Sequence, residues 1–242
     1  MIYEYRSRIR YSECDENAKL PVGGIVNYYQ DTATFHGEDL GIGVSYLTQH
    51  HLAWLLSYWQ INVRRLPDLG EKIITKTWAY DFKAFYGLRN LTMETDQGEP
   101  LSCANSVWIL MDMEKQLPVR VSEEMQQLYG VHEKFDMEYT PRKVKEPKAE
   151  GAGDIVCLPR FEVTHHHLDT NHHVNNGQYI QMALECLEEP FTAGRLRVEY
   201  KKQARLGDGI TPLVETDTGT GAVTVALRGD DGASFAVAEI VH

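Results

Sequence analysis

The stretch HHHLDTNHHVNNGQYI at residues 165–180 holds most of the side chains that could do chemistry. It places five histidines within nine positions, beside an aspartate and three asparagines. Clustered histidines can bind a metal ion, and a histidine that titrates near neutrality can move a proton. The same composition is also typical of a solvated surface loop. The residues around the stretch help to decide between these interpretations.

The three consecutive histidines at 165–167 are poor candidates for a metal site. Zinc ligands are usually spaced along the chain and supported by cysteine, carboxylate and outer-shell partners. We expect residues 165–167 to lie on a strand, where neighbouring side chains point to opposite faces and cannot all reach one ion. The sequence therefore predicts no metal site and no other cofactor.

His173 is the candidate general base, because an imidazole with an ordinary pKa titrates at about pH 6.5. Asn175 and Asn176 stand where the N-cap of a helix is expected, and Gly177 would let a substrate approach the backbone closely. Free amide groups around residues 176–178 could hydrogen-bond a developing oxyanion. The alternatives are a plain helix cap for the asparagines and a solvated loop for His173.

The composition of the whole chain is that of an ordinary globular protein, with 242 residues, of which 43% are hydrophobic and 24% charged. Its net charge of -11 argues against nucleic acid as a partner, because phosphates require a basic surface. No apolar stretch is long enough to span a bilayer, and the N-terminus lacks a signal-peptide core. We expect a cytoplasmic protein with four reduced thiols, at Cys14, Cys103, Cys157 and Cys186.

The order of elements is repeated along the chain. DENAKLPVGGIVNYYQD at 15–31 aligns without a gap on DTNHHVNNGQYIQMALE at 169–185. Further on, LGEKI at 69–73 matches LGDGI at 206–210, and DQGEPLSCA at 96–104 matches DDGASFAVA at 230–238. Three matches in one order indicate a duplicated fold.

Each repeat is predicted to be a strand, a loop, a helix and then several antiparallel strands, which is an α+β arrangement. We expect the two helices at about 24–36 and 177–187. The polar segment 132–153, broken by proline and glycine, is expected to link a domain at 1–131 to one at 154–242.

The two repeats differ at the position of the candidate base. Lys19 in the first repeat aligns with His173, whereas Asp15 and Asn17 align with an identical aspartate and asparagine. A lysine stays protonated at neutral pH unless its pKa is strongly perturbed. We therefore expect the chemistry in the second repeat alone, with the first repeat free to shape the substrate pocket.

LDTNHHVNNGQYI at 168–180 and VEYKKQARLGD at 198–208 resemble signature segments of the acyl-acyl-carrier-protein (acyl-ACP) thioesterases, bacterial type. The resemblance implies a tandem hot-dog fold, in which each half has a long helix wrapped by an antiparallel sheet. It also implies a catalytic set whose first members, Asp169 and Asn171, orient the attacking water and the imidazole.

The fourth catalytic position is where this chain departs from the family pattern. Gln203 stands where the family usually has a glutamate, and a glutamine cannot act as a base. Glu199 lies four residues earlier on the expected strand and would share a face with Gln203. The two would be roughly 13 Å apart, so one cannot simply replace the other.

The resemblance implies hydrolysis of fatty acyl thioesters to free fatty acid and carrier thiol, in fatty acid biosynthesis. An acyl-CoA thioesterase, a non-catalytic acyl-binding protein and a hot-dog dehydratase are the alternatives. A basic cluster could dock the acidic acyl carrier protein, or could be ordinary solvated strand surface. The prediction also allows a homodimer. The cluster comprises Arg195, Arg197, Lys201, Lys202 and Arg205.

Overall fold

The computed structural model describes residues 2–147, 154–169 and 171–242, which form two compact units, Met1–Thr140 and Pro141–His242. The segment expected as a linker is divided between them. The backbone amide of Thr140 donates to Gln60 Oε1 in the first unit (2.9 Å), and that of Val144 donates to Glu199 Oε2 in the second (3.0 Å). Residues 148–153 of that segment lie outside the described part.

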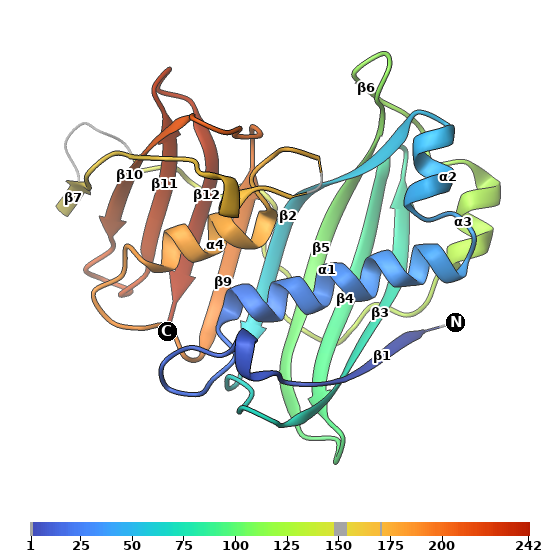
Figure 1. The fold of residues 1–242 in the computed structure, drawn as a ribbon, viewed down its shortest axis with the longest axis horizontal. Coiled ribbons are helices and arrows are strands. Elements are labelled where there is room, and N and C mark those ends of the chain that lie inside the picture. Colours follow the sequence, from blue (N-terminus) through green and yellow to red (C-terminus); the bar gives the residue numbers. More distant parts are fainter. Residues whose placement is uncertain (1, 148–153, 170) are drawn as a thin grey trace. The chain divides into compact units, whose positions relative to one another are not determined.

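The first unit is one antiparallel sheet with a long helix (Figure 1). Its strands lie in the order β1-β3-β4-β5-β2, and a short β6 pairs with β5. The strands are β1 (Tyr3–Arg8), β2 (Leu52–Val63), β3 (Lys72–Lys83), β4 (Tyr86–Thr95), β5 (Pro100–Asp112) and β6 (Leu117–Pro118). The helices are η1 (Tyr11–Glu13), α1 (Val22–Asp39), α2 (Val44–Gln49) and α3 (Glu123–Tyr129).

Helix α1 forms where the apolar spacing predicts one, but it is longer than expected. Val22, Ile25, Val26 and Tyr29 recur at helical spacing and are buried. This face packs against β1 and β3, and α1 lies across the sheet in Figure 1. The burial of one continuous apolar face therefore fixes the helix that follows the first repeat's loop.

The second unit has the same order of strands, β7-β10-β11-β12-β9, which corresponds to β1-β3-β4-β5-β2 in the first. Strand β8 pairs with β10. The strands are β7 (Asp154–Cys157), β8 (Phe161–Glu162), β9 (Gly194–Tyr200), β10 (Gly209–Thr216), β11 (Val223–Gly229) and β12 (Ser234–Val241). The helices are η2 (His165–His167) and α4 (Asn176–Leu184), and α4 packs against β11 and β12 (Figure 1).

Helix α4 is shorter than the expected 177–187, because the chain leaves the helix at Glu185, its C-cap. The second half therefore has a helix of 9 residues, against 18 in α1. No helix in the described part of the chain is both long and apolar enough to cross a membrane.

The predicted duplication is confirmed at matching turns. Gly98 donates its amide to Thr95 O (3.0 Å) at the β4–β5 hairpin, and Gly232 donates to Gly229 O (2.9 Å) at the β11–β12 hairpin. Both turn glycines have positive φ, at 85° and 81°. That conformation favours glycine, which explains why the two hairpins share this residue in sequence.

Candidate active site

The loop that carries His173 is folded around the carboxylate of Asp169. Asp169 Oδ1 accepts hydrogen bonds from the backbone amides of Asn171 (2.8 Å) and His173 (3.3 Å). The Asp169 amide donates to His173 O (2.8 Å), which closes the loop. His172 adopts a left-handed conformation, with φ of 61°. Asp169 and His173 are half-buried, whereas Asn171 is exposed, and Thr170 lies outside the described residues.

The first unit contains the same loop without the histidine. Asp15 Oδ1 accepts from the amides of Asn17 and Lys19, at 2.9 Å in each case. The Asp15 amide donates to Lys19 O (2.8 Å), and Ala18 has a φ of 57°. The aspartate therefore builds this backbone whether or not a histidine is present.

The N-terminus of α4 is capped as the asparagines predict. Asn175 is the N-cap, and its Oδ1 accepts the Gly177 amide (2.8 Å). Its backbone oxygen accepts the Gln178 amide (2.9 Å). The expectation of free amides at Gly177 and Gln178 is therefore wrong for this structure, because Asn175 satisfies both. Asn176 is the first residue of the helix, and its carbonyl accepts from Tyr200 Oη (2.9 Å).

Gln203 is connected to the histidine loop through its neighbour. The Val174 amide donates to Ala204 O (3.0 Å), so His173 and Gln203 each stand one residue away from the same hydrogen bond. The Ala204 amide in turn donates to Tyr179 Oη on α4 (2.8 Å). Ala204 is fully buried and Gln203 is exposed.

Glu199 and Gln203 do not share a strand face, so that expectation is corrected. Strand β9 ends at Tyr200, and Gln203 lies in the connection that follows it. Glu199 Oε2 accepts the Val144 amide (3.0 Å) and lies 4.0 Å from Lys201 Nζ. Its carboxylate is thus engaged in holding the segment that leads into the second unit.

The three histidines at 165–167 form a short 3-10 helix and not a strand. Thr164 stabilises this turn: its amide donates to His167 Nδ1 (3.0 Å), and its hydroxyl lies 3.0 Å from His166 Nδ1. Burial and the neighbouring His166 lower the pKa of His167. Among the described residues, no three His, Cys, Asp or Glu side chains are grouped as metal ligands.

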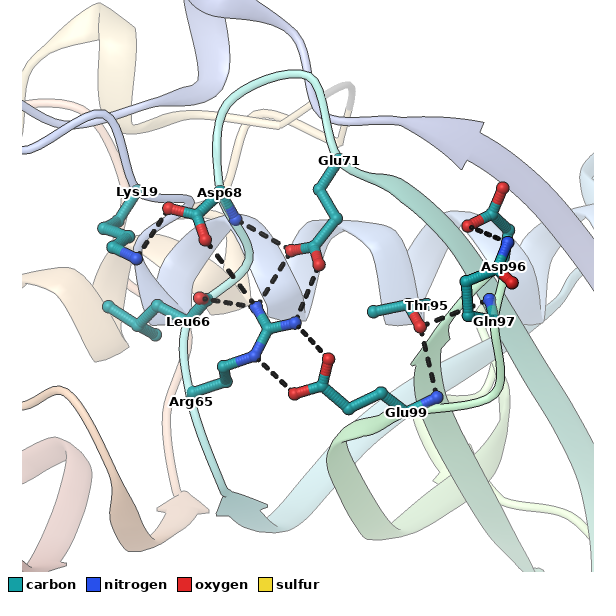
Figure 2. Close-up of polar contacts among 9 residues, drawn as sticks. All are labelled: Lys19, Arg65, Leu66, Asp68, Glu71, Thr95, Asp96, Gln97 and Glu99. Atoms are coloured by element: carbon teal, nitrogen blue, oxygen red, sulfur yellow. Dashed lines mark hydrogen bonds and ion pairs between the residues drawn. The ribbon is translucent and has the colours of Figure 1, made fainter.

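In the first unit, the position equivalent to His173 is held in an ion-pair network (Figure 2). Lys19 Nζ lies 2.6 Å from Asp68 Oδ1, and the Asp68 amide donates to Glu71 Oε2 (2.9 Å). Arg65 binds Glu71 through two nitrogens (2.7 and 2.9 Å) and Glu99 through two contacts of 2.7 Å. The alignment of LGEKI on LGDGI places Arg205 at the position of Asp68, so the second unit cannot form this lysine–aspartate pair.

Much of the expected docking cluster is neutralised within the second unit. Arg197 is 8% exposed, and it binds Glu239 and two backbone carbonyls. Lys201 and Lys202 pair with Glu146 (2.6 Å) and Asp231 (2.5 Å). Arg195 is half-buried on β9. Arg205 is exposed, and it makes no ion pair with any residue in the described ranges.

Two family models cover most of the chain. The Acyl-ACP thioesterase N-terminal domain matches residues 1–129, and the Acyl-ACP thioesterase C-terminal domain matches residues 157–240. The chain belongs to the acyl-ACP thioesterase family. The expected family and the α+β, tandem hot-dog fold are thereby confirmed.

Among curated proteins, this thioesterase family member is similar to plant enzymes. It is 26% identical to the chloroplastic palmitoyl-acyl carrier protein thioesterase of Gossypium hirsutum, over 97% of this chain and 62% of that protein. It is 24% identical to the chloroplastic oleoyl-acyl carrier protein thioesterase 1 of Arabidopsis thaliana, over 96% and 70%. The chain thus spans roughly 60% of the length of the first curated relatives, with 62%, 56% and 58% covered.

Solved structures share the fold. An acyl-ACP thioesterase from Bacteroides thetaiotaomicron matches with a TM-score of 0.86 and 20% identity, over 99% of this chain and 97% of that one. A 12:0-ACP thioesterase from Umbellularia californica matches with a TM-score of 0.82 and 17% identity, over 99% and 96%. Both matches extend over both units.

The residues that sequence reasoning missed are Tyr179 and Ala204, which connect α4 to the loop. The signal was present in the repeat alignment, which places Tyr179 on Ile25 and Ala204 on Pro67. The second repeat has both the Tyr179 hydroxyl and the Ala204 amide, whereas Ile25 and Pro67 in the first repeat provide neither group. Such paired exchange indicates a contact, but the alignment alone does not reveal which atoms meet.

Proposed function

We propose that this chain hydrolyses fatty acyl thioesters of acyl carrier protein, releasing a free fatty acid and the carrier thiol. The observation that carries the proposal is the match of both halves to one thioesterase family, combined with His173 and Gln203 lying beside a shared backbone hydrogen bond. Water attacks the thioester carbonyl, the carbon–sulfur bond breaks, and the thiolate takes up a proton.

His173 is proposed as the general base. Its imidazole takes a proton from the attacking water and returns it to the departing sulfur, which balances the reaction without a cofactor. The Asp169 carboxylate acts through the backbone, because its Oδ1 accepts the amide of His173 and so fixes that residue. Asn171 is exposed next to this turn, where its side-chain amide is proposed to orient the water.

Gln203 is proposed to orient the same water and not to deprotonate it. A glutamine side chain has both a donor and an acceptor but no titratable proton near neutral pH. The base role therefore falls on His173 alone.

Asn175 is proposed to supply the oxyanion donor. Its Oδ1 is fixed by the Gly177 amide, so the Nδ2 group of the same side chain is turned away from that contact and has two hydrogens to donate. A preorganised donor of this kind stabilises charge that develops in the transition state. The positive end of the α4 dipole adds to the effect.

Arg205 is proposed as the docking contact for the carrier. Acyl carrier protein is expected to be acidic, and Arg205 is an exposed cation two residues beyond Gln203. Lys201 and Lys202 make weaker candidates, since each already pairs with a carboxylate. We also propose a reducing, cytoplasmic location, which is supported by four cysteines without disulfides.

The test of the function is thiol release, measured with a chromogenic reagent, from acyl carrier protein and from coenzyme A carrying the same acyl group. We expect kcat/KM to be about tenfold or more higher on the carrier, because only the carrier offers a docking surface. Equal or greater turnover of the coenzyme A ester would indicate the rival thioesterase. Saturable acyl binding without thiol release would indicate a binding protein.

The docking contact is tested by Arg205→Glu. We expect a higher KM for the acyl carrier protein substrate, and an unchanged KM for a small uncharged acyl thioester. Arg160→Glu is the matched control, because Arg160 is also an exposed cation of the second unit, paired with Asp230 (2.9 Å). A rise in KM of equal size for both substrates would contradict docking at Arg205.

A further inference from the structure

Tyr179 is buried next to the segment that carries Gln203, and its hydroxyl accepts a hydrogen bond from the backbone there. It lies on α4, is 3% exposed, and its Oη accepts the Ala204 amide at 2.8 Å. Its ring packs edge-on against Tyr200, with the ring centroids 5.8 Å apart. Burial raises the pKa of Tyr179 to about 12, so the phenol is neutral under working conditions.

Ala204 is held through both of its backbone groups. Its amide donates to Tyr179, and its carbonyl accepts the amide of Val174 (3.0 Å). Val174 follows His173 directly, and Ala204 follows Gln203 directly. These two hydrogen bonds therefore form a continuous connection from helix α4, through Ala204, to the histidine loop.

The first unit retains one of these two bonds and lacks the other. Leu20, the counterpart of Val174, donates its amide to Pro67 O (2.9 Å). Pro67 stands in place of Ala204 and has no amide hydrogen. Ile25 stands in place of Tyr179 and is fully buried, but it has no hydroxyl. The loop that has Lys19 in place of His173 is thus built without the tyrosine contact.

The difference between the two units shows that the loop can fold without the tyrosine–amide hydrogen bond. A buried amide must find an acceptor, but a proline at that position removes the need, as Pro67 does. The hydrogen bond between the Tyr179 hydroxyl and the Ala204 amide occurs in the second unit, where Gln203 directly precedes Ala204. In the first unit, that preceding residue is the buried Leu66, which has no polar group to place.

We infer that Tyr179 is a positioning residue of the site, which acts through the Ala204 amide to hold Gln203 in register with the His173 loop. This inference rests on the proposed function, since it assigns Tyr179 a part in the same hydrolysis. Tyr179 does not touch the reacting atoms, and its contribution depends on the side chain of Gln203.

The first test measures thiol release by Tyr179→Phe, which keeps the ring and removes the acceptor. We expect kcat to fall about 10- to 100-fold with KM nearly unchanged, because a small misplacement of an orienting group can cost that much. Tyr80→Phe is the control: it removes a half-buried phenol that donates to Asn105 Oδ1 (2.8 Å) in the first unit. Its kcat should stay within about twofold of wild type.

The decisive measurement repeats Tyr179→Phe in a Gln203→Ala background. If Tyr179 acts by positioning Gln203, its loss has little further effect on kcat once that side chain is gone. Full, additive losses in the double variant would overturn the inference and leave Tyr179 a structural role. A Tyr179→Phe kcat within about twofold of wild type would overturn it as well.

A readout without substrate separates this inference from the proposed function. Hydrogen exchange at the Ala204 amide should be protected in wild type and about tenfold or more faster in Tyr179→Phe. Faster exchange with no thiol release from the wild-type protein would refute the hydrolase and, with it, the role of Tyr179. Unchanged exchange with an active wild type would refute the tyrosine contact alone.

Discussion

The loop before α1 and the loop before α4 have the same backbone and hold different side chains. In both, an aspartate Oδ1 accepts two amides, and a residue with positive φ follows three positions later. Lys19 pairs with Asp68 in the first, whereas His173 occupies the equivalent position in the second. The aspartate thus stabilises the backbone that both loops share. The residues that differ, Lys19 and His173, are those that could add chemistry.

The largest expected effect comes from changing the proposed base, which only the second loop has. His173→Ala should lower kcat for thiol release by about 100- to 10,000-fold, the contribution of a positioned base. Lys19→Ala changes the equivalent residue, removes an exposed ion pair and should leave kcat unchanged. A loss below about threefold in His173→Ala would remove the imidazole from the mechanism.

A smaller effect is expected from removing the aspartate that stabilises the backbone of each loop. Asp15→Ala and Asp169→Ala each remove an acceptor of two amides, and each should lower the free energy of unfolding of its own unit by about 1–2 kcal/mol. Asparagine at either position keeps an acceptor oxygen and should restore most of that stability.

The two units can be followed separately during urea unfolding. All four tryptophans lie in the first unit, so their fluorescence reports on Asp15→Ala, while far-UV circular dichroism also includes the second unit. Thiol release should fall in Asp169→Ala and remain in Asp15→Ala. A stability loss in one loop but not in the other would contradict a shared structural role.

The smallest effect concerns the ion pairs that Arg65 makes in the first unit. Hydrogen bonding to Arg65 lowers the pKa of Glu71 below its ordinary value. The stabilisation is therefore present above the carboxylate's ordinary pKa, near 4.5, and is lost as the pH falls through the lowered folded-state value.

Arg65→Ala should remove this acid sensitivity. At neutral pH it should cost the first unit about 1 kcal/mol or less, because the network is partly exposed. The measurement is the tryptophan-detected unfolding midpoint as a function of pH, which should flatten in the variant. A wild-type midpoint that does not fall on acidification would contradict the assignment.

Local sequence signals predicted the repeat, the α1 helix and the Asn175 cap. Each depends on residues close together in the chain, such as Asp169 with Asn171 or Gly98 in its hairpin turn. The catalytic roles of Asp169, Asn171, His173 and Gln203 stay predictions, since no geometry here tests them.

Other features depend on contacts between distant residues. The end of β9 at Tyr200 follows from its pairing with β12, which no local pattern shows. Lys202 is neutralised by Asp231, and Arg197 by Glu239, partners that only the folded sheet brings near. The 3-10 turn at residues 165–167 depends on Thr164 binding two imidazoles, an arrangement that histidine repetition alone does not predict.

Pro67 has a consequence for how such a duplicated chain can change over generations. Converting the first loop to the side chains of the second requires exchanges at several positions, and no single exchange completes it. These positions are Lys19, Ile25, Leu66, Pro67 and Asp68. Replacing Pro67 alone would introduce a backbone amide opposite Ile25, which has no acceptor to offer it. A chain with that single exchange would lose stability without gaining the other side chains of the second loop, so selection would keep Pro67 and Ile25 together.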